Sequence, residues 1–175
     1  GVLVLSGTGS AVLGIKNTQT RLMGGWGHLL TESGSSYAVV RDFICQIIRQ
    51  YETYGTFTEL GRKFMEHLNF TKIDEFKVLV YQNSKKDIAK YSKFINEMAE
   101  QEHNEEAIAL LKQAGRDLAN DVKNVVKALN LTANAVIGFR VGFITNVTIT
   151  QDELMKMLKE YNINITLVSG DNDPV

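Results

Sequence analysis

The order in which strands and helices are predicted along this sequence is that of an α/β protein with a helical region inserted between its strands. Two apolar, branched runs stand at the start, at residues 1–6 and 11–15, and a short Gly-rich turn joins them. Such runs are typical of buried strands. Two further runs, 135–139 and 163–168, predict strands near the other end. Helical periodicity dominates the residues between, so we expect the helices to separate the first strands from the last ones.

The first part of the helical region repeats apolar residues every three or four positions, the spacing of one helix face. These residues are Tyr37, Val40, Ile44, Ile47 and Tyr51. Thr56 and Glu59 are spaced as a capping box, which predicts a short helix that ends near Leu68. A polar stretch, 83–86, then leads into another expected helix that carries Ile88 on its apolar face.

The strongest helical pattern keeps one apolar face over about seven turns. Its members are Ala107, Leu111, Ala114, Leu118, Val122, Val125 and Leu129. A helix from Asn104 to Leu129 would be about 38 Å long. Thr150 and Glu153 repeat the capping-box spacing and predict one more helix before the last strand.

Composition limits the class of protein. A chain of 175 residues that is 44% hydrophobic can bury one core, so we expect one domain. With 19 basic and 20 acidic residues the net charge is −1, which argues against a nucleic-acid or membrane surface. No apolar run reaches the roughly 18 residues of a membrane span. The single cysteine, Cys45, cannot form an internal disulfide, so a reducing, cytoplasmic location is expected.

Both ends of the sequence have the pattern of cut points in a longer chain. The first strand begins at the start, and Asp173-Pro174 has the N-cap and first-turn pattern of a helix that does not follow. Because a native terminus rarely falls inside a core element, we expect one lobe of a longer protein, truncated at both ends.

The turn between the first two runs, Gly7-Thr8-Gly9-Ser10, combines two glycines with two hydroxyls. Glycine lets backbone N–H groups approach an anion without a Cβ in the way. The turn therefore presents amide donors and the hydroxyls of Thr8 and Ser10, a set that suits phosphate oxygens. An ordinary structural turn is the alternative. A second Gly-rich segment around the only tryptophan, Trp26, favours a ligand cleft.

Three segments together resemble one protein family. VLSGTGS (4–10), GGWGHLL (24–30) and GSSY (34–37) are similar to the start of the C-terminal lobe in the N-acetylglucosamine kinase-like family, also called the BadF/BadG-type ATPase family. That family belongs to the sugar kinase, Hsp70 and actin superfamily. The likeness runs along nearly the whole chain and ends at residues 171–175, which resemble the family's closing segment. It implies a ribonuclease H-like (actin-like ATPase) lobe with a mixed sheet and a helical insertion. Its parts would be phosphate and sugar loops in 1–34, a mainly helical block in 35–130, and returning strands with a nucleotide-side loop in 135–175.

The resemblance implies a nucleotide site. In the family the first Gly-rich turn touches the terminal phosphates of ATP, which places the four residues of that turn at the phosphates. A Gly-Gly or Gly-Ser pair that passes beside adenosine corresponds to Val141-Gly142 here, so one small residue is lost. Asn146 follows one helical turn later as a polar contact. Ala114 matches a small residue beside the nucleotide, and membership of the apolar helix face is the alternative for it.

The resemblance also implies a sugar pocket at the second Gly-rich segment. Gly25, Trp26 and Gly27 would border the amino sugar, and a core tryptophan is the alternative for Trp26. The family's substrate-binding Asp falls on Glu32, whose carboxylate is one methylene further out and can still accept hydrogen bonds from sugar hydroxyls. A solvated surface glutamate is the alternative for Glu32. His28 is expected to be a structural residue, since the family's base is an Asp upstream of this chain.

The function that the resemblance implies is ATP-dependent phosphorylation of an N-acetylated amino sugar, of the N-acetylglucosamine or N-acetylmuramic acid type. This chain would supply only the nucleotide-binding lobe and would be inactive alone, because the base lies outside it. The expected partners are ATP and an amino sugar, with Mg²⁺ held by the phosphates and the other lobe rather than by a metal site of this chain. A homodimer is left open.

Two departures from the family pattern favour other functions. Val141 stands where a small residue is usual, and Ser33 follows the substrate-binding position where the family usually has Glu. They are the features that favour a non-catalytic nucleotide- or sugar-binding regulatory module, or an ATPase of the same family without sugar kinase activity.

Overall fold

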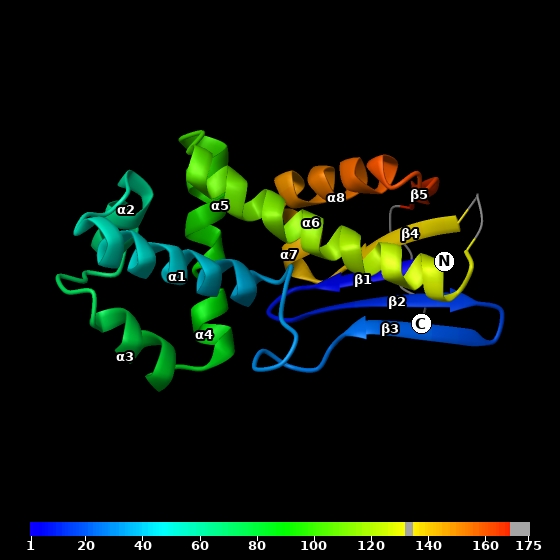
Figure 1. Cartoon of the computed structure of the whole chain (residues 1–175), viewed down its shortest axis with the longest axis horizontal. Coiled ribbons are helices and arrows are strands. Elements are labelled where there is room, and N and C mark those ends of the chain that lie inside the picture. Colours follow the sequence, from blue (N-terminus) through cyan, green and yellow to red (C-terminus); the bar gives the residue numbers. More distant parts are fainter. Residues whose placement is uncertain (132–134, 169–175) are drawn as a thin grey trace.

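Five strands form one mixed sheet in the computed structural model, which describes residues 1–131 and 135–168 (Figure 1). They are β1 (Val2–Ser6), β2 (Ser10–Lys16), β3 (Gln19–Gly24), β4 (Ala135–Arg140) and β5 (Ile165–Leu167), in the order β3-β2-β1-β4-β5. Strand β2 pairs antiparallel with both β1 and β3, whereas β4 pairs parallel with β1 and β5 pairs parallel with β4. The predicted α/β class is confirmed. The closing segment at 171–175 lies outside the described residues.

The helices lie in two places relative to this sheet. In the described residues they are α1 (Ser36–Tyr54), α2 (Glu59–His67), α3 (Glu75–Gln82), α4 (Lys85–Ala89), α5 (Ser92–Gln101), α6 (Glu105–Ala128), α7 (Gly142–Asn146) and α8 (Thr148–Glu160). Helices α1 to α5 lie mainly beyond one end of the sheet, whereas α6 and α8 lie across one of its faces (Figure 1). Among these helices, none is long and apolar enough to cross a membrane.

Some helix boundaries differ from those predicted. The sequence did not predict α3, and the helix expected after residues 83–86 is two helices that meet at Lys90 and Tyr91. Thr58, not Thr56, caps α2, because its Oγ1 accepts from the N–H of Gly61 at 3.1 Å. The capping-box prediction at Thr56 is therefore wrong.

The predicted cap at Thr150 is also wrong. Thr150 lies inside α8 and is fully buried, and its Oγ1 donates to the carbonyl oxygen of Leu111 in α6 at 2.9 Å. A buried hydroxyl needs a partner, and here the partner is on the neighbouring helix rather than at the helix start.

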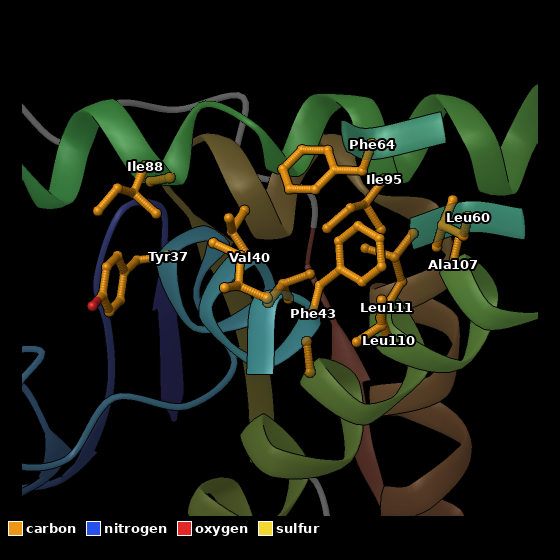
Figure 2. Packing of buried hydrophobic residues seen from close by; sticks show 14 of the residues in the cluster. Tyr37, Val40, Phe43, Leu60, Phe64, Ile88, Ile95, Ala107, Leu110 and Leu111 are labelled. Carbon is orange, nitrogen blue, oxygen red and sulfur yellow. The ribbon is translucent and has the colours of Figure 1, made fainter. Parts of the chain in front are cut away.

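Helix α6 belongs to two hydrophobic clusters. Asn104 caps its start by accepting from the N–H of Ala107 at 3.0 Å, and its predicted apolar face is buried. Its first half packs with α1 to α5 around Phe43 and Phe64, whose ring centroids are 5.0 Å apart (Figure 2). Its second half packs with the sheet and α8, and Val122 is fully buried there. One long helix thus joins the helical region to the sheet.

The ends of β1 and β4 place two loops side by side. Because these strands are parallel neighbours, their carboxyl ends meet at the same edge of the sheet, where α/β proteins commonly bind ligands. The turn after β1 starts at Gly7, and the residue after β4 is Val141. A Cβ on Gly7 would overlap Cγ1 of Val141, so the two loops are in contact. This edge is where a ligand would meet both of them.

Candidate functional site

The turn between β1 and β2 is fixed to the start of α1. The N–H of Gly7 donates to the carbonyl oxygen of Gly9 at 2.9 Å, which closes the turn. The carbonyl oxygen of Gly7 accepts from both the N–H and the Oγ of Ser36, at 2.9 and 2.8 Å. Ser36 is the first residue of α1 and is buried. The turn therefore has a defined shape, with Thr8 half-buried between its two glycines.

Two more serines join this turn to the segment that follows β3. The Oγ of Ser6 donates to the carbonyl oxygen of Gly34 at 2.6 Å, and the Oγ of Ser10 donates to the carbonyl oxygen of Ser33 at 2.5 Å. The N–H of Gly25 donates in turn to the carbonyl oxygen of Ser10 at 3.1 Å. The hydroxyl proton of Ser10 is therefore used within the protein, which leaves the threonine as the hydroxyl donor of this turn.

A cavity of about 590 Å³ opens beside the turn, within the roughly 300–1,000 Å³ typical of small-molecule pockets. The predicted nucleotide-side residues that line it are Gly7, Thr8, Gly142 and Asn146. Helices α4 and α5 and the junction between them add Lys86, Lys90, Lys93 and Asn96. No carboxylate is among the described side chains that line this cavity. Its charge is thus positive, as a site for an anion requires.

The backbone at Val141 is unusual. Its φ is 74°, in a region that a β-branched residue rarely adopts. The family pattern that this sequence resembles has a small residue there, which would fit such a backbone with less strain. The Val141 side chain lies against Gly7, so each position limits the size of the other. Gly142 begins α7 and still lines the cavity.

Glu32 is buried beside the turn. Only 8% of its surface is exposed, so the interpretation as a solvated surface residue is wrong. Its Oε2 accepts from the Nζ of Lys85 at 3.1 Å, whereas its Oε1 is buried and accepts from no described residue. A Cβ on Gly9 would lie 2.9 Å from the Lys85 Nζ and 3.5 Å from the Glu32 Oε1. A buried carboxylate oxygen without a donor is costly, so it points to a ligand that donates there.

The segment around Trp26 turns sharply and exposes its indole. Gly24, Gly25 and Gly27 have φ of 78°, 79° and 91°, which glycine adopts without strain. Trp26 is 71% exposed, so the interpretation as a core tryptophan is wrong. Because this segment is hydrogen-bonded to Ser10, its start lies next to the turn that carries Thr8.

His28 and Tyr37 pack against each other at the same end of the molecule. Their rings meet edge to face with centroids 5.2 Å apart, which agrees with a structural role for His28. Burial raises the pKa of Tyr37; Arg41 opposes that rise and the nearby charge of Glu32 adds to it. The phenol therefore stays protonated at neutral pH, and its hydroxyl remains a hydrogen-bond donor.

Ala114 lies apart from the other predicted residues. It is buried in α6 and lines a different, smaller cavity of about 210 Å³ together with Gly34 and Ala38 at the start of α1. The structure does not bring it to the cavity that holds Thr8. Its position on the apolar face of α6 accounts for its small side chain.

Sequence reasoning missed the lysines of α4 and α5. The pattern at 83–86 predicts only a polar connection, yet Lys85 lies against Gly9 and Lys86 lines the large cavity. A signal was present, because Lys85, Lys86, Lys90 and Lys93 fall within nine residues. It could not be interpreted without knowing that α4 packs beside the turn.

Two solved structures of proteins assigned as N-acetylglucosamine kinases have a similar fold. The protein from Chromobacterium violaceum superposes with a TM-score of 0.73 at 19% identity, with 99% of this chain and 56% of that chain covered. The protein from Porphyromonas gingivalis superposes with a TM-score of 0.70 at 15% identity, with 97% and 56% covered. The chain therefore shares the fold of these two structures, and the expected mixed sheet with a helical insertion is confirmed.

The chain belongs to the BadF/BadG/BcrA/BcrD ATPase family, which matches residues 1–170. It is 28% identical over 177 residues to an N-acetylmuramic acid/N-acetylglucosamine kinase of Clostridium acetobutylicum, with 99% of this chain and 58% of that protein covered. It is 26% identical over 179 residues to an N-acetyl-D-glucosamine kinase of Dictyostelium discoideum, with 99% and 56% covered. The chain therefore spans just over half the length of the curated relatives that it matches.

Proposed function

We propose that this chain is the nucleotide-binding lobe of an ATP-dependent kinase that phosphorylates an N-acetylated amino sugar. The observation that carries the proposal is the position of Glu32. Its buried carboxylate, with one unpaired oxygen, lies against Gly9 of a turn whose Thr8 lines a positively charged cavity. A place for a hydroxyl-bearing acceptor and a place for phosphates are thus adjacent, as phosphoryl transfer requires. Family membership and the activities in the names of both curated relatives support this assignment.

On the phosphate side, the donors are the backbone amides of the turn and the hydroxyl of Thr8. The volume of the cavity and its lysines without carboxylates fit the polyphosphate of a nucleotide. When bound, ATP with Mg²⁺ supplies the phosphoryl group. Thr8 donates a hydrogen bond that orients the terminal phosphate, and such positioning is the main contribution of a protein to phosphoryl transfer. Gly142 and Asn146, which line the same cavity next to the turn, border the nucleotide there.

On the sugar side, Glu32 binds the acceptor. Its Oε1 accepts a hydrogen bond from a sugar hydroxyl, while its Oε2 keeps its partner Lys85. Trp26, with Gly25 and Gly27 on either side, forms a wall of the pocket. N-acetylglucosamine and N-acetylmuramic acid are the first candidates, because the names of the curated relatives list them. The longer side chain of Glu32 is expected to shift the range of sugars relative to relatives with Asp.

A second candidate is a non-catalytic module that binds nucleotide or sugar, or a family ATPase that does not phosphorylate sugars. The backbone strain at Val141, on the edge of the nucleotide cavity, is the observation that favours it. Under the kinase proposal, the general base is expected to be an Asp outside this chain, as the family resemblance implies. General base catalysis typically contributes about 10²–10⁴-fold.

Two substitutions in the protein with both lobes test the choice. Thr8→Ala should remove about 2–3 kcal/mol of transition-state stabilisation, so kcat should fall while the sugar KM stays nearly unchanged. Thr18→Ala, at an exposed threonine in the β2–β3 turn, is the matched control. Glu32→Gln should weaken sugar binding by about 1.5–3 kcal/mol in calorimetry and leave ADP binding unchanged. Glu160→Gln on the exposed end of α8 is its control.

The results separate the candidates. A Thr8→Ala variant with unchanged kcat and an altered sugar KM would show that Thr8 does not face phosphate. Unchanged affinity of Glu32→Gln for a panel of amino sugars would favour the non-catalytic module over the kinase.

A further inference from the structure

Three lysines line one wall of the large cavity. Lys86 is in α4, Lys90 ends that helix, and Lys93 is in the first turn of α5. They are four and three residues apart, and both junction residues, Lys90 and Tyr91, keep right-handed helical backbone angles. On a helix such spacing places side chains on one face. The seven-residue interval from the first lysine to the last corresponds to about 10 Å along a helix axis.

The negative charge near these lysines comes from Asp87, which interacts electrostatically with Lys86 and Lys90, and from Glu97. Within the described residues, the only carboxylate within ion-pair distance of the three is that of Glu97, 4.0 Å from the Nζ of Lys93 on an exposed surface. Lys90 lies over the ring of Tyr91, at 5.2 Å from its centroid. In a cleft with low-dielectric walls, an excess of cations raises the local concentration of anions. The three lysines are therefore available to bind an external anion.

The position of Lys86 is well defined by its neighbours. Ser84 and Asp87 form a reciprocal capping box at the start of α4, with the Ser84 Oγ accepting from the Asp87 N–H at 3.1 Å. Lys85, the adjacent residue, is held by Glu32 against Gly9. The start of α4 is thereby fixed beside the Gly-rich turn, and Lys86 enters the cavity from there.

We propose that Lys86, Lys90 and Lys93 bind the polyphosphate of the nucleotide together with the Gly-rich turn. The inference rests on the proposed function and extends it, because it assigns phosphate binding to the helical insertion as well as to the sheet edge. A row of three cations suits two or three linked phosphates better than a single one. The turn contributes directional amide and hydroxyl donors, and the lysines contribute charge.

A second group in the same cavity indicates the nucleoside part of the ligand. The Oδ1 of Asn96 is buried and accepts from no described residue. Phosphate oxygens at neutral pH cannot satisfy it, because they are acceptors themselves. A hydroxyl of ribose or an exocyclic amine of a base can. Three lysines and the Asn96 Oδ1 line one cavity, so it suits a nucleoside polyphosphate, which carries both phosphates and hydrogen-bond donors, better than inorganic phosphate.

The test is calorimetric titration of the protein with both lobes, with ADP, pyrophosphate and adenosine as the ligands. The double variant Lys86→Gln/Lys90→Gln should bind ADP and pyrophosphate about tenfold more weakly than the wild type, with adenosine binding unchanged. Lys156→Gln, at an exposed lysine of α8 outside the cavity, is the matched control. The charge-preserving Lys86→Arg/Lys90→Arg variant should retain most of the ADP affinity. Thermal melts of each variant confirm that it is folded.

Each other outcome overturns the inference. If the double glutamine variant keeps wild-type affinity for ADP while Thr8→Ala loses it, the phosphates contact the turn alone, and the proposed kinase function stands without the lysines. If neither variant weakens ADP binding, both the inference and the nucleotide site are wrong. Failure of the wild-type protein with both lobes to bind either ADP or pyrophosphate at millimolar concentration also overturns the inference, because the three lysines then hold no phosphate.

Discussion

The Nζ of Lys85 lies 3.1 Å from the Oε2 of Glu32, although the two residues are 53 positions apart in the sequence. Glu32 belongs to the segment after β3, and Lys85 is the first residue of α4. Their ion pair is largely buried, with 3% and 24% of the two side chains exposed. It attaches the helical region to the Gly-rich turn, and it holds one carboxylate oxygen while leaving the other for a ligand.

Removal of the Lys85 charge should therefore destabilise the protein. Lys85→Met would leave a buried carboxylate without its cation, which we expect to cost about 2–3 kcal/mol, less than for a fully buried pair because Lys85 keeps some exposure. Urea unfolding measures the change. Arg62→Met, which breaks the exposed pair with Glu66, should cost less than about 1 kcal/mol. Equal effects of the two substitutions would show that the Glu32 pair is no more than a surface contact.

Gly7 and Val141 should show strong coupling in a double-mutant cycle. Gly7→Ala places a methyl group on Cγ1 of Val141 and should cost about 1–3 kcal/mol as overpacking. Val141→Gly relieves the backbone strain of the positive φ. The net gain in the free energy of unfolding should be about 1 kcal/mol, because the higher conformational entropy of the unfolded glycine variant offsets part of the relieved strain. In the double variant the cost of Gly7→Ala should largely vanish. Additive effects in urea unfolding would contradict the contact.

Val122 should not tolerate a charge. It is fully buried where the second half of α6 packs on the sheet and α8. Val122→Asp would bury an unpaired carboxylate at a cost of several kcal/mol, enough to abolish soluble expression of a marginally stable chain. Asn124→Asp, at an exposed position of α6 two residues further on, is the control, and its yield should stay near that of the wild type. A Val122→Asp variant with an unchanged melting temperature would show that this face of α6 is exposed.

With Asp121 charged at neutral pH, the wild-type chain should be less stable than its Asp121→Asn variant. Burial, and to a smaller extent the charge of Asp117, raise the pKa of Asp121 in the folded state. An unfolded Asp has a pKa of about 3.9, so between that value and the raised one the folded state binds the proton more tightly. The contribution of Asp121 to the free energy of unfolding is therefore fully present below about pH 4, and it is lost as the pH rises through the pKa of the folded state.

Asp121→Asn removes this loss, so it should raise the urea midpoint at pH 7, with a difference that shrinks toward zero near pH 4. Asp152→Asn, at an exposed position of α8, provides the comparison for a carboxylate in water. A variant that is less stable at pH 7, or whose gain does not depend on pH, would show that Asp121 has a stabilising partner.

The sequence was sufficient for features that depend on neighbours along the chain. The period of α6 is visible because every third or fourth residue from Ala107 to Val125 faces a core. The Gly-rich turn is recognisable because glycine and hydroxyl residues are required at adjacent positions there. Thr56 and Thr150 show the limit of local patterns: the same spacing occurs before a helix, where another threonine caps it, and inside one, where the hydroxyl bonds across to α6.

The less predictable part of the site depends on contacts between distant segments. Nothing local to Glu32 shows that it is buried, since its cation comes from α4. Similarly, the cavity acquires its positive charge only when α4 and α5 fold back beside the turn of Thr8. The location of Ala114 follows from the packing of α6 against α1, which a one-dimensional pattern does not contain.

The contact between α6 and α8 determines which parts of the molecule can move. A Cβ on Gly115, at the middle of α6, would lie 2.6 Å from the carbonyl oxygen of Thr150, so the two helix backbones touch there. This point is also where α6 passes from the helical cluster to the sheet cluster. Neither helix can roll or slide past the other without a clash, so the sheet, α6 and α8 behave as one rigid body. The helical cluster packs on the first half of α6, so its position relative to the sheet is set by the same contact.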